Sequence, residues 1–216
     1  VIVAISTVTG SSAQENGDQS VTTTITENES APTITLATSA TSIAENSSDT
    51  VTLTATASQI SDEDITVTLA TTGTGTSGTD YSSVNATTIT ISAGDTAGTK
   101  TFTITDDSVS EGDETAIVAI SAVSGGGATE SGTQSVTVTI TDNDSPSITL
   151  TSSVSTLTEN SSTTVTLTAT ASITATSDIT VTLATTGTAT DGTDYSAVNG
   201  TTITISAGST TGTKTF

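Results

Sequence analysis

The strongest β-strand pattern in this chain is V-T-L-T-A-T-A-S at residues 51–58, and it recurs unchanged at residues 165–172. Apolar side chains alternate with threonine in it. A period of two is typical of a β-strand with one buried and one solvated face, and threonine suits the solvated face because it is polar and β-branched. Similar alternation continues along the chain and no segment has a clear helical period, so we predict an all-β protein.

Longer repeats extend outward from this segment. I-T-V-T-L-A-T-T-G-T at 65–74 and T-T-I-T-I-S-A-G at 87–94 also recur, and every copy lies 114 residues further along. The N-terminal stretch joins the array at an offset of 115, as in Ile5 with Ile120. A period of about 114 corresponds to one whole domain per repeat and matches the size of an immunoglobulin-like sandwich.

The repeat divides the chain into three parts. We expect residues 1–30 to be the last two strands of a preceding repeat, residues 33–144 to be one complete repeat, and residues 147–216 to be the first five strands of a following repeat. By this alignment Val1 falls in mid-strand and Phe216 matches Phe102, so we interpret the sequence as a window from a longer array.

The complete repeat contains seven alternating segments separated by turn-forming residues, near 33–38, 51–57, 65–71, 87–92, 99–105, 115–121 and 135–141. Seven short strands of this kind favour two packed antiparallel sheets, so the fold class we predict is tandem immunoglobulin-like antiparallel β-sandwiches. The aromatic residues fall at equivalent positions, Tyr81 with Tyr195 and Phe102 with Phe216. We interpret them as packing residues of an otherwise aliphatic core.

Composition excludes several functions. The chain has 216 residues with 2 Lys or Arg, 23 Asp or Glu and a formal net charge of −21, and it contains no His, Cys, Met or Trp. Two basic residues cannot neutralise nucleic acid or anionic lipid, and no apolar run is long enough to enter a membrane directly. Catalysis by Ser-His-Asp or Cys-His, zinc, haem and disulfides are also excluded. Carboxylates remain, and they suit hard cations, above all Ca²⁺.

Many of the acidic residues are expected at one end of the sandwich. If consecutive strands alternate in direction, all connections after odd-numbered strands lie at that end, and they carry Glu45, Asp80, Asp106, Asp107, Glu111, Asp113, Glu114, Asp142 and Asp144. Gathered carboxylates repel one another unless a cation lies between them. Calcium accepts 6–8 oxygens, whereas magnesium keeps its waters and is the weaker candidate. The alternative is that these acids belong to solvated turns that keep the protein soluble.

The same loops carry a family resemblance. The chain resembles a Calx-β repeat in T-D-Y at 79–81, T-F-T-I-T-D-D-S-V-S-E-G-D-E-T at 101–115 and S-V-T-V-T-I-T-D-N-D at 135–144. Calx-β domains are named from the calcium-binding regulatory modules of sodium–calcium exchangers. They also occur in tandem in large bacterial surface proteins and in animal adhesion proteins. The resemblance covers the complete repeat and both fragments.

The resemblance implies a set of calcium ligands. In the complete repeat they are Glu45, Asp80, Asp106, Asp107, Glu111, Asp142 and Asp144, with Asn143 where the family pattern often has a third Asp. In the first fragment the terminal D-N-D is replaced by Glu27, Asn28 and Glu29. In the last fragment the counterparts of Glu45 and Asp80 are Glu159 and Asp194.

These features predict a calcium-binding, calcium-rigidified structural segment of a long extracellular adhesin, stalk or filament, because T-D-N-D lies next to the following repeat. The alternatives are a calcium-sensing regulatory module and a glycan- or surface-binding module. We predict no enzymatic activity, since no cleft-forming insertion or aromatic sugar platform accompanies the carboxylates. We expect a secreted or cell-surface location. The expected partners are the neighbouring identical repeats of the same chain, together with self-association that is lateral or end to end.

Overall fold

The computed structural model describes residues 1–26, 29–47, 49–159 and 161–216. The chain divides into two compact units, residues 1–31 and residues 32–216, and each is described by itself. Within the described residues the regular elements are all β-strands, which agrees with the predicted all-β class. These residues form no helix long and apolar enough to cross a membrane.

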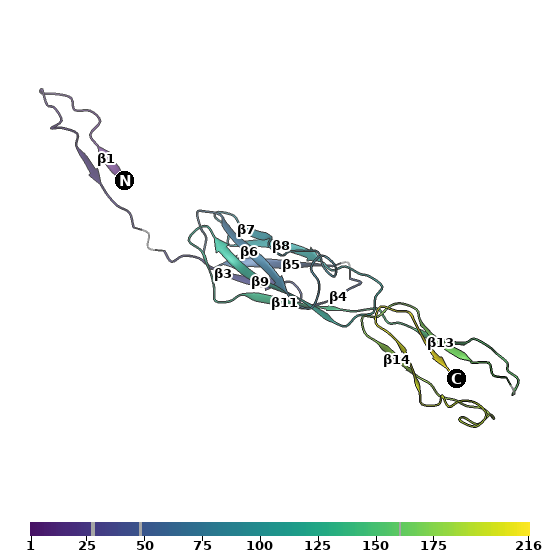
Figure 1. Cartoon of the computed structure of the whole chain (residues 1–216). Helices are drawn as coiled ribbons and strands as arrows, with labels where there is room; N and C mark the ends of the chain where they lie inside the picture. Colours follow the sequence, from purple (N-terminus) through teal and green to yellow (C-terminus); the bar gives the residue numbers. More distant parts are fainter. Residues whose placement is uncertain (27–28, 48, 160) are drawn as a thin grey trace. The chain divides into compact units, whose positions relative to one another are not determined.

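The complete repeat is a sandwich of two sheets (Figure 1). Its strands are β3 (Thr33–Thr38), β4 (Ser42–Ala44), β5 (Thr50–Ala57), β6 (Ile65–Thr72), β7 (Thr88–Ile91), β8 (Ala97–Thr103), β9 (Glu114–Ser124), β10 (Thr129–Glu130) and β11 (Ser135–Thr141). One sheet has the strand order β10-β3-β5-β8 and the other has the order β4-β11-β9-β6-β7. The chain passes from the first sheet to the second between β3 and β4.

An aliphatic core fills the space between the two sheets. The buried side chains of the central strands alternate with threonines that are half-buried or exposed, and they include Val51 and Leu53 of β5 and Val67 of β6. Tyr81 and Phe102 are buried in the same core, with ring centroids 5.7 Å apart and an interplanar angle of 59°. The packing role expected for this aromatic pair is therefore confirmed.

All seven expected strands are present, and two short strands add to them. β4 pairs with the end of β11 and β10 pairs with the start of β3, both in parallel, so the sheets are not wholly antiparallel. The β4 segment, S-I-A, is too short to show an alternation that could predict it. It is nevertheless important, because it places the residue that follows it, Glu45, beside the end of β11.

The following repeat shows that strand length depends on pairing as well as on sequence. Residues 179–188 repeat the sequence of residues 65–74, yet β14 (Ile179–Thr182) has 4 residues and β6 has 8. β6 pairs with both β7 and β9, whereas β14 pairs with β15 (Thr202–Ile205) in a two-stranded sheet. The other sheet of this repeat contains β12 (Ile148–Ser152), β13 (Thr166–Ala171) and β16 (Thr211–Thr215).

The N-terminal unit is a two-stranded antiparallel hairpin. It consists of β1 (Ile2–Ala4) and β2 (Ser20–Thr22), with Val3 opposite Val21. Their counterparts in the complete repeat are β9 and β11, which have 11 and 7 residues. The hairpin is therefore similar in sequence to two central sandwich strands, and each of its own strands has 3 residues.

Candidate metal centre

Glu45 is buried, with 5% of its surface exposed, and it is the only charged residue in that class among the described residues. It follows β4, whose pairing with β11 sets Ala44 opposite Thr141. The Glu45 backbone N–H donates to the Thr141 carbonyl at 3.0 Å. Carboxylate oxygens of Glu45, Asp142 and Asp144, together named the Glu45 group, lie within 4.8 Å of one another.

A second cluster, named the Glu114 group, consists of Asp80, Glu111 and Glu114. One carboxylate oxygen from each residue lies within 4.8 Å of the others. Asp80 is held by its own turn, because its Oδ2 accepts the backbone N–H of Thr76 at 2.5 Å. The residues of the two groups lie after β4, between β6 and β7, between β8 and β9, at the start of β9 and after β11, as the strand alternation predicts for one end of the sandwich.

The connection between β8 and β9 links the two groups. The Glu111 backbone N–H donates to Asp142 Oδ2 at 2.9 Å, so a residue of the Glu114 group is bonded to a residue of the Glu45 group. The other oxygen of Asp142 accepts the Asp144 N–H at 2.9 Å. Within the connection, Asp107 Oδ1 accepts the Val109 N–H at 2.7 Å. These bonds orient the carboxylates and leave acceptor positions for a cation.

Burial and like charges raise the pKa of the most enclosed carboxyls. Burial is the largest cause that raises the pKa of Glu45 from 4.5 to about 7, and the carboxylates of Asp107 and Asp142 add to it. Burial also raises the pKa of Glu114 to about 7, followed by its hydrogen bond with Asp80 and the charge of that residue. Because both pKa values are raised, the ionised carboxylates are disfavoured until a cation or a proton neutralises them.

The pKa values of two more acids are also raised. Burial, and then the charge of Asp80, raises the pKa of Glu111. Burial, and then the charge of Asp142, raises the pKa of Asp144. Asp144 Oδ2 is buried and has no hydrogen-bond partner among the described residues. A buried carboxylate oxygen without a partner is costly, and a cation would supply what it lacks.

The donor set therefore fits a hard divalent cation. All six residues of the two groups supply carboxylate oxygens, the ligand type that calcium prefers, and a carboxylate can bind through one oxygen or two. The chain has 2 basic residues against 23 acidic ones. Protein cations are therefore too few to balance the acids. The Glu45 group and the Glu114 group could each hold an ion.

The structure brings together five of the acids implied by the resemblance, which are Glu45, Asp80, Glu111, Asp142 and Asp144. Asp106 and Asp107 are exposed and lie outside the two groups, and their charges help to raise the pKa of Asp144. Asn143 has a different contact, because its Oδ1 accepts the backbone N–H of Asn46 at 3.1 Å. It thereby braces the backbone next to Glu45.

The acids implied in the two fragments are not part of either group. Glu27 lies outside the described residues, and Glu29 is exposed in the N-terminal unit. Glu159 and Asp194 are exposed and line one hollow of about 400 Å³ beside Phe216. By the repeat alignment, the connection that carries Glu111 and Glu114 has no counterpart within residues 147–216.

Glu114 was not among the ligands implied by the resemblance. Its place in the chain predicts that it lies at the acidic end, and the sequence also carries a signal for its orientation. Glu114 begins β9 two residues before Ala116 and four before Val118, which are both fully buried. Alternate residues of a strand share a face. An acid that continues a buried apolar face is therefore expected to point inward.

The chain is similar to a known domain family and to solved structures. The Calx-beta domain family matches residues 27–144 and residues 141–213. The solved apo form of the Calx CBD1 domain is 21% identical over 52% of this chain and 99% of that chain, with a TM-score of 0.44. CBD12 from CALX1.2 is 19% identical over 83% of this chain and 74% of that chain, with a TM-score of 0.44. The calcium binding domain CBD12 of CALX1.1 is 18% identical over 84% and 74%, with a TM-score of 0.45.

No curated protein matches the chain. The two adjacent family matches confirm the tandem Calx-β repeats predicted from the loop sequences. Since they cover well over half of its length, the chain belongs to the Calx-beta domain family.

Proposed function

We propose that this chain is a calcium-binding structural segment of a long extracellular adhesin, stalk or filament, and that calcium makes the joint between its repeats rigid. The Calx-beta family is one of calcium-binding domains, and this supports the choice of ion. In this proposal the Glu45 group and the Glu114 group each hold an ion. Asp106 and Asp107 complete the coordination from the exposed side.

One contact carries the proposal. Ser110 belongs to the same connection as Glu111, and its backbone forms a parallel bridge with Ala175 of the following repeat. The Ser110 N–H donates to the Thr174 carbonyl at 2.9 Å, and the Ser110 carbonyl accepts the Thr176 N–H at 2.9 Å. The connection that presents the acids is therefore also in contact with the next repeat.

The charge of a bound cation would stabilise the joint between the repeats. A cation bound by Glu111 and Asp142 holds the connection and the end of β11 together, and Ser110 is then fixed against the next repeat. Without the cation the carboxylates repel one another and the connection loosens. Extracellular modules bind calcium with a Kd of about 10⁻⁴–10⁻³ M. At a calcium concentration about tenfold above Kd, one site adds about 1.4 kcal/mol to the free energy of unfolding.

The joint can be tested by spin labelling, because the chain contains no cysteine of its own. Thr99→Cys and Thr213→Cys introduce labels at equivalent exposed positions on β8 and β16. Electron–electron distance measurements are made on labelled protein diluted with unlabelled protein. We expect a narrow distance distribution in calcium and a broad one in chelator, with magnesium giving a broad distribution.

The rigid joint and the metal site can be contradicted by different results. Equal widths in calcium and chelator would contradict the rigid joint. A calorimetric titration without calcium binding would contradict the metal site itself. The same titration distinguishes a structural segment from a calcium sensor, since sensors bind calcium with a Kd of about 10⁻⁷–10⁻⁵ M.

A further inference from the structure

We propose that Thr74 and Thr115 are positioning residues for the Glu114 group. Their paired hydroxyls hold the connection between β6 and β7 against the start of β9 and thereby raise the calcium affinity of that group. The inference rests on the proposed function, because the two threonines have this role only if the group binds the ion. Thr74 lies two residues after the end of β6, and Thr115 is the second residue of β9.

The two threonines bind each other through side chains and backbone. The Thr115 N–H donates to Thr74 Oγ1 at 2.9 Å, and the Thr74 N–H donates to Thr115 Oγ1 at 3.2 Å. The two hydroxyl oxygens are 3.3 Å apart and share a further hydrogen bond. The Gly75 N–H donates to the Thr115 carbonyl at 3.0 Å. Four hydrogen bonds therefore fasten residues 74 and 75 to one residue of β9.

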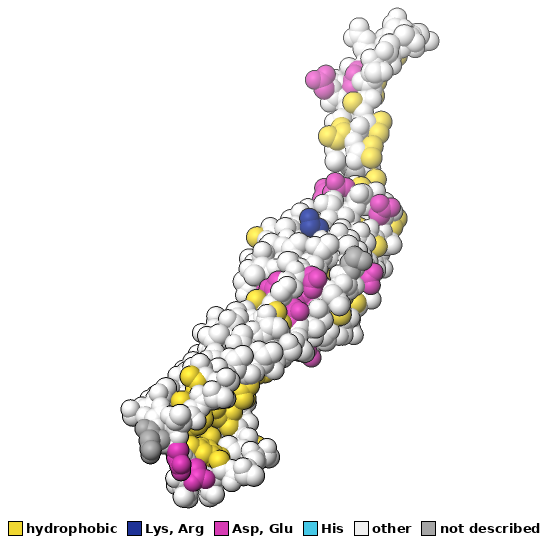
Figure 2. Space-filling view, turned by 90° about the vertical axis from the view of Figure 1, so that its right-hand side faces the viewer, with side chains coloured by type: hydrophobic (Ala, Val, Ile, Leu, Met, Phe, Trp, Pro, Cys, Tyr) yellow, Lys and Arg dark blue, Asp and Glu magenta, His cyan; other side chains and the backbone are white. Residues whose placement is uncertain are grey.

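This pairing begins where the backbone ladder between β6 and β9 ends, at Thr72 opposite Ile117. Side chains that are neither apolar nor charged, together with the backbone, cover most of the face seen in Figure 2. Thr74 and Thr115 differ from solvated threonines of such a surface, because each hydroxyl accepts a backbone N–H of the other residue. The hydroxyls thus extend the connection between the two strands beyond the ladder.

Two glycines allow the close approach of this connection to β9. Gly73 has a φ of 123°, and a side chain there would overlap the Thr115 carbonyl oxygen. A Cβ at Gly75 would lie 3.4 Å from Glu114 Oε2 and 3.5 Å from Tyr81 Cε1. The backbone that Thr115 holds therefore passes directly beside a carboxylate of the Glu114 group.

The same connection orients Asp80. The Thr76 N–H donates to Asp80 Oδ2, and the Thr76 carbonyl accepts the Asp80 N–H at 3.0 Å, so the two residues form one tight turn next to Gly75. The Asp80 backbone has a second support, because its carbonyl accepts the Thr105 N–H at 2.9 Å. Loss of the threonine pair would leave this backbone in place and free the segment that orients the Asp80 carboxylate.

Orientation affects affinity because the carboxylates of the Glu114 group repel one another. Asp80, Glu111 and Glu114 bring oxygens within 4.8 Å. If their backbone is not held, these side chains can move apart in the ion-free protein, and a cation must gather them again. The rigidity of a site is one of the features that set calcium affinity. Hydrogen bonds that orient metal ligands typically change metal affinity by about 10–100-fold.

The test is a calcium titration of the full chain by calorimetry. Thr74→Val and Thr115→Val each remove one hydroxyl with little change of shape, and we expect each to weaken calcium binding at the Glu114 group by at least about tenfold. Thr115→Val is the milder change, since the Thr115 N–H keeps its bond to Thr74 Oγ1. Thr74→Ser keeps the hydroxyl and should bind calcium like the unaltered chain. Thr72→Val, at the exposed end of β6, is the control.

Two further measurements distinguish positioning from a general loss of stability. In the Glu114→Gln background, Thr74→Val should cause no additional loss of calcium affinity, because the group that it positions is already disabled. In chelator, hydrogen exchange of the Thr76 amide should speed up in Thr74→Val by a larger factor than exchange of the Val118 amide. Val118 lies in the core, so its exchange follows global stability.

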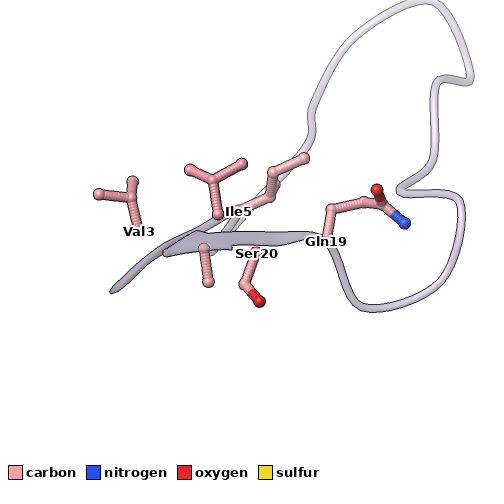
Figure 3. A pocket seen from close by; sticks show the side chains of 6 residues that line it. Val3, Ile5, Gln19 and Ser20 are labelled. Carbon is pink, nitrogen blue, oxygen red and sulfur yellow. The ribbon is translucent and has the colours of Figure 1, made fainter. Parts of the chain in front are cut away.

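Other parts of the chain give the same background in every titration. The hollow of the N-terminal hairpin in Figure 3 is lined by Val3, Ile5, Gln19 and Ser20 among others, and none of the described residues that line it is acidic. Calcium that binds weakly to exposed acids elsewhere is common to all variants and cancels in the comparison.

The titrations separate this inference from the proposed function. If the unaltered chain binds no calcium, the proposed function fails and the positioning role fails with it. If the unaltered chain binds calcium and both valine variants bind it equally well, the positioning role alone is overturned. It is also overturned if Thr74→Ser binds as weakly as Thr74→Val, or if Thr74→Val weakens binding further in the Glu114→Gln background.

Discussion

The Glu111 backbone N–H and Asp142 Oδ2 are joined by a 2.9 Å hydrogen bond between residues 31 positions apart in sequence. The second oxygen of Asp142 accepts the Asp144 N–H at 2.9 Å. Asp142 therefore fastens the connection between β8 and β9 to the end of β11, and it is the residue through which the Glu45 group and the Glu114 group are linked. The connection also contacts the next repeat through Ser110.

Asp142→Asn tests this link. The side-chain amide keeps one acceptor oxygen but turns an N–H₂ group toward a backbone N–H that was bonded, and it removes a charged ligand. We expect calcium affinity to fall by at least about tenfold, because ligand charge sets affinity. Loss of this partly buried hydrogen bond to a charged group costs about 1–3 kcal/mol, so the melting temperature should also fall by several degrees. Asp95→Asn, an exposed residue in the connection before β8, is the control. Equal effects of the two substitutions would refute the link.

Glu45→Gln is expected to stabilise the protein without calcium and to weaken calcium binding. Glutamine removes the buried charge that Asp107 and Asp142 repel, and its amide oxygen can keep the backbone hydrogen bond from Asp107. The melting temperature in chelator should therefore rise by several degrees, while calcium affinity falls at least about tenfold. Glu159→Gln alters the equivalent, exposed residue of the following repeat and should change neither quantity. A lower melting temperature of Glu45→Gln in chelator would show that repulsion is not what Glu45 contributes.

Glu114→Gln tests the residue that the resemblance omitted. Its carboxyl shares the Glu114 group with Asp80 and Glu111, so calcium stoichiometry measured by calorimetry should fall if this group holds its own ion. The adjacent Asp113 is exposed, and Asp113→Asn provides a control with the same loss of charge at the next residue. If both variants bind calcium like the unaltered chain, Glu114 is not a ligand.

Sequence analysis predicts the sandwich because threonine alternation marks one buried and one solvated face, as at Val51 and Leu53. It also predicts the acidic end, because strand direction alone determines which connections meet there. It does not predict the partition into two groups. That partition depends on β4, a strand of 3 residues that sets Glu45 beside Asp142 through a parallel pairing with β11. Nor does it predict the short β14, since identical residues form a longer strand where β9 is present to pair with them.

The ion-free protein should become more stable as the pH falls from 8 to 5. The folded-state pKa values of Glu45 and Glu114 are about 7, above the ordinary value of 4.5. Between these values the folded state binds more protons than the unfolded chain, so the free energy of unfolding rises as the pH decreases and levels off below about 4.5. Thermal melts of metal-depleted protein check this direction.

The double variant Glu45→Gln/Glu114→Gln is the control for that pH dependence, because the pKa values of Glu111 and Asp144 are also raised. It should show a distinctly smaller rise in melting temperature between pH 8 and pH 5. Calcium competes with protons for the same carboxylates, so its stabilising effect on the unaltered chain should shrink at pH 5. If the double variant keeps the full pH dependence, the two glutamates are not its source.

Thr176→Pro separates the rigid joint from the metal site. It removes the N–H that donates to the Ser110 carbonyl at 2.9 Å and leaves every residue of the acidic connection in place. We therefore expect calcium affinity to stay within about twofold of the unaltered chain, while the spin-label distance distribution in calcium becomes as broad as in chelator. Ser177→Pro, one residue further along, is the control and should keep the narrow distribution. A narrow distribution in Thr176→Pro would mean that calcium stiffens the joint through contacts other than the Ser110 bridge, and the role given to that bridge would have to be withdrawn.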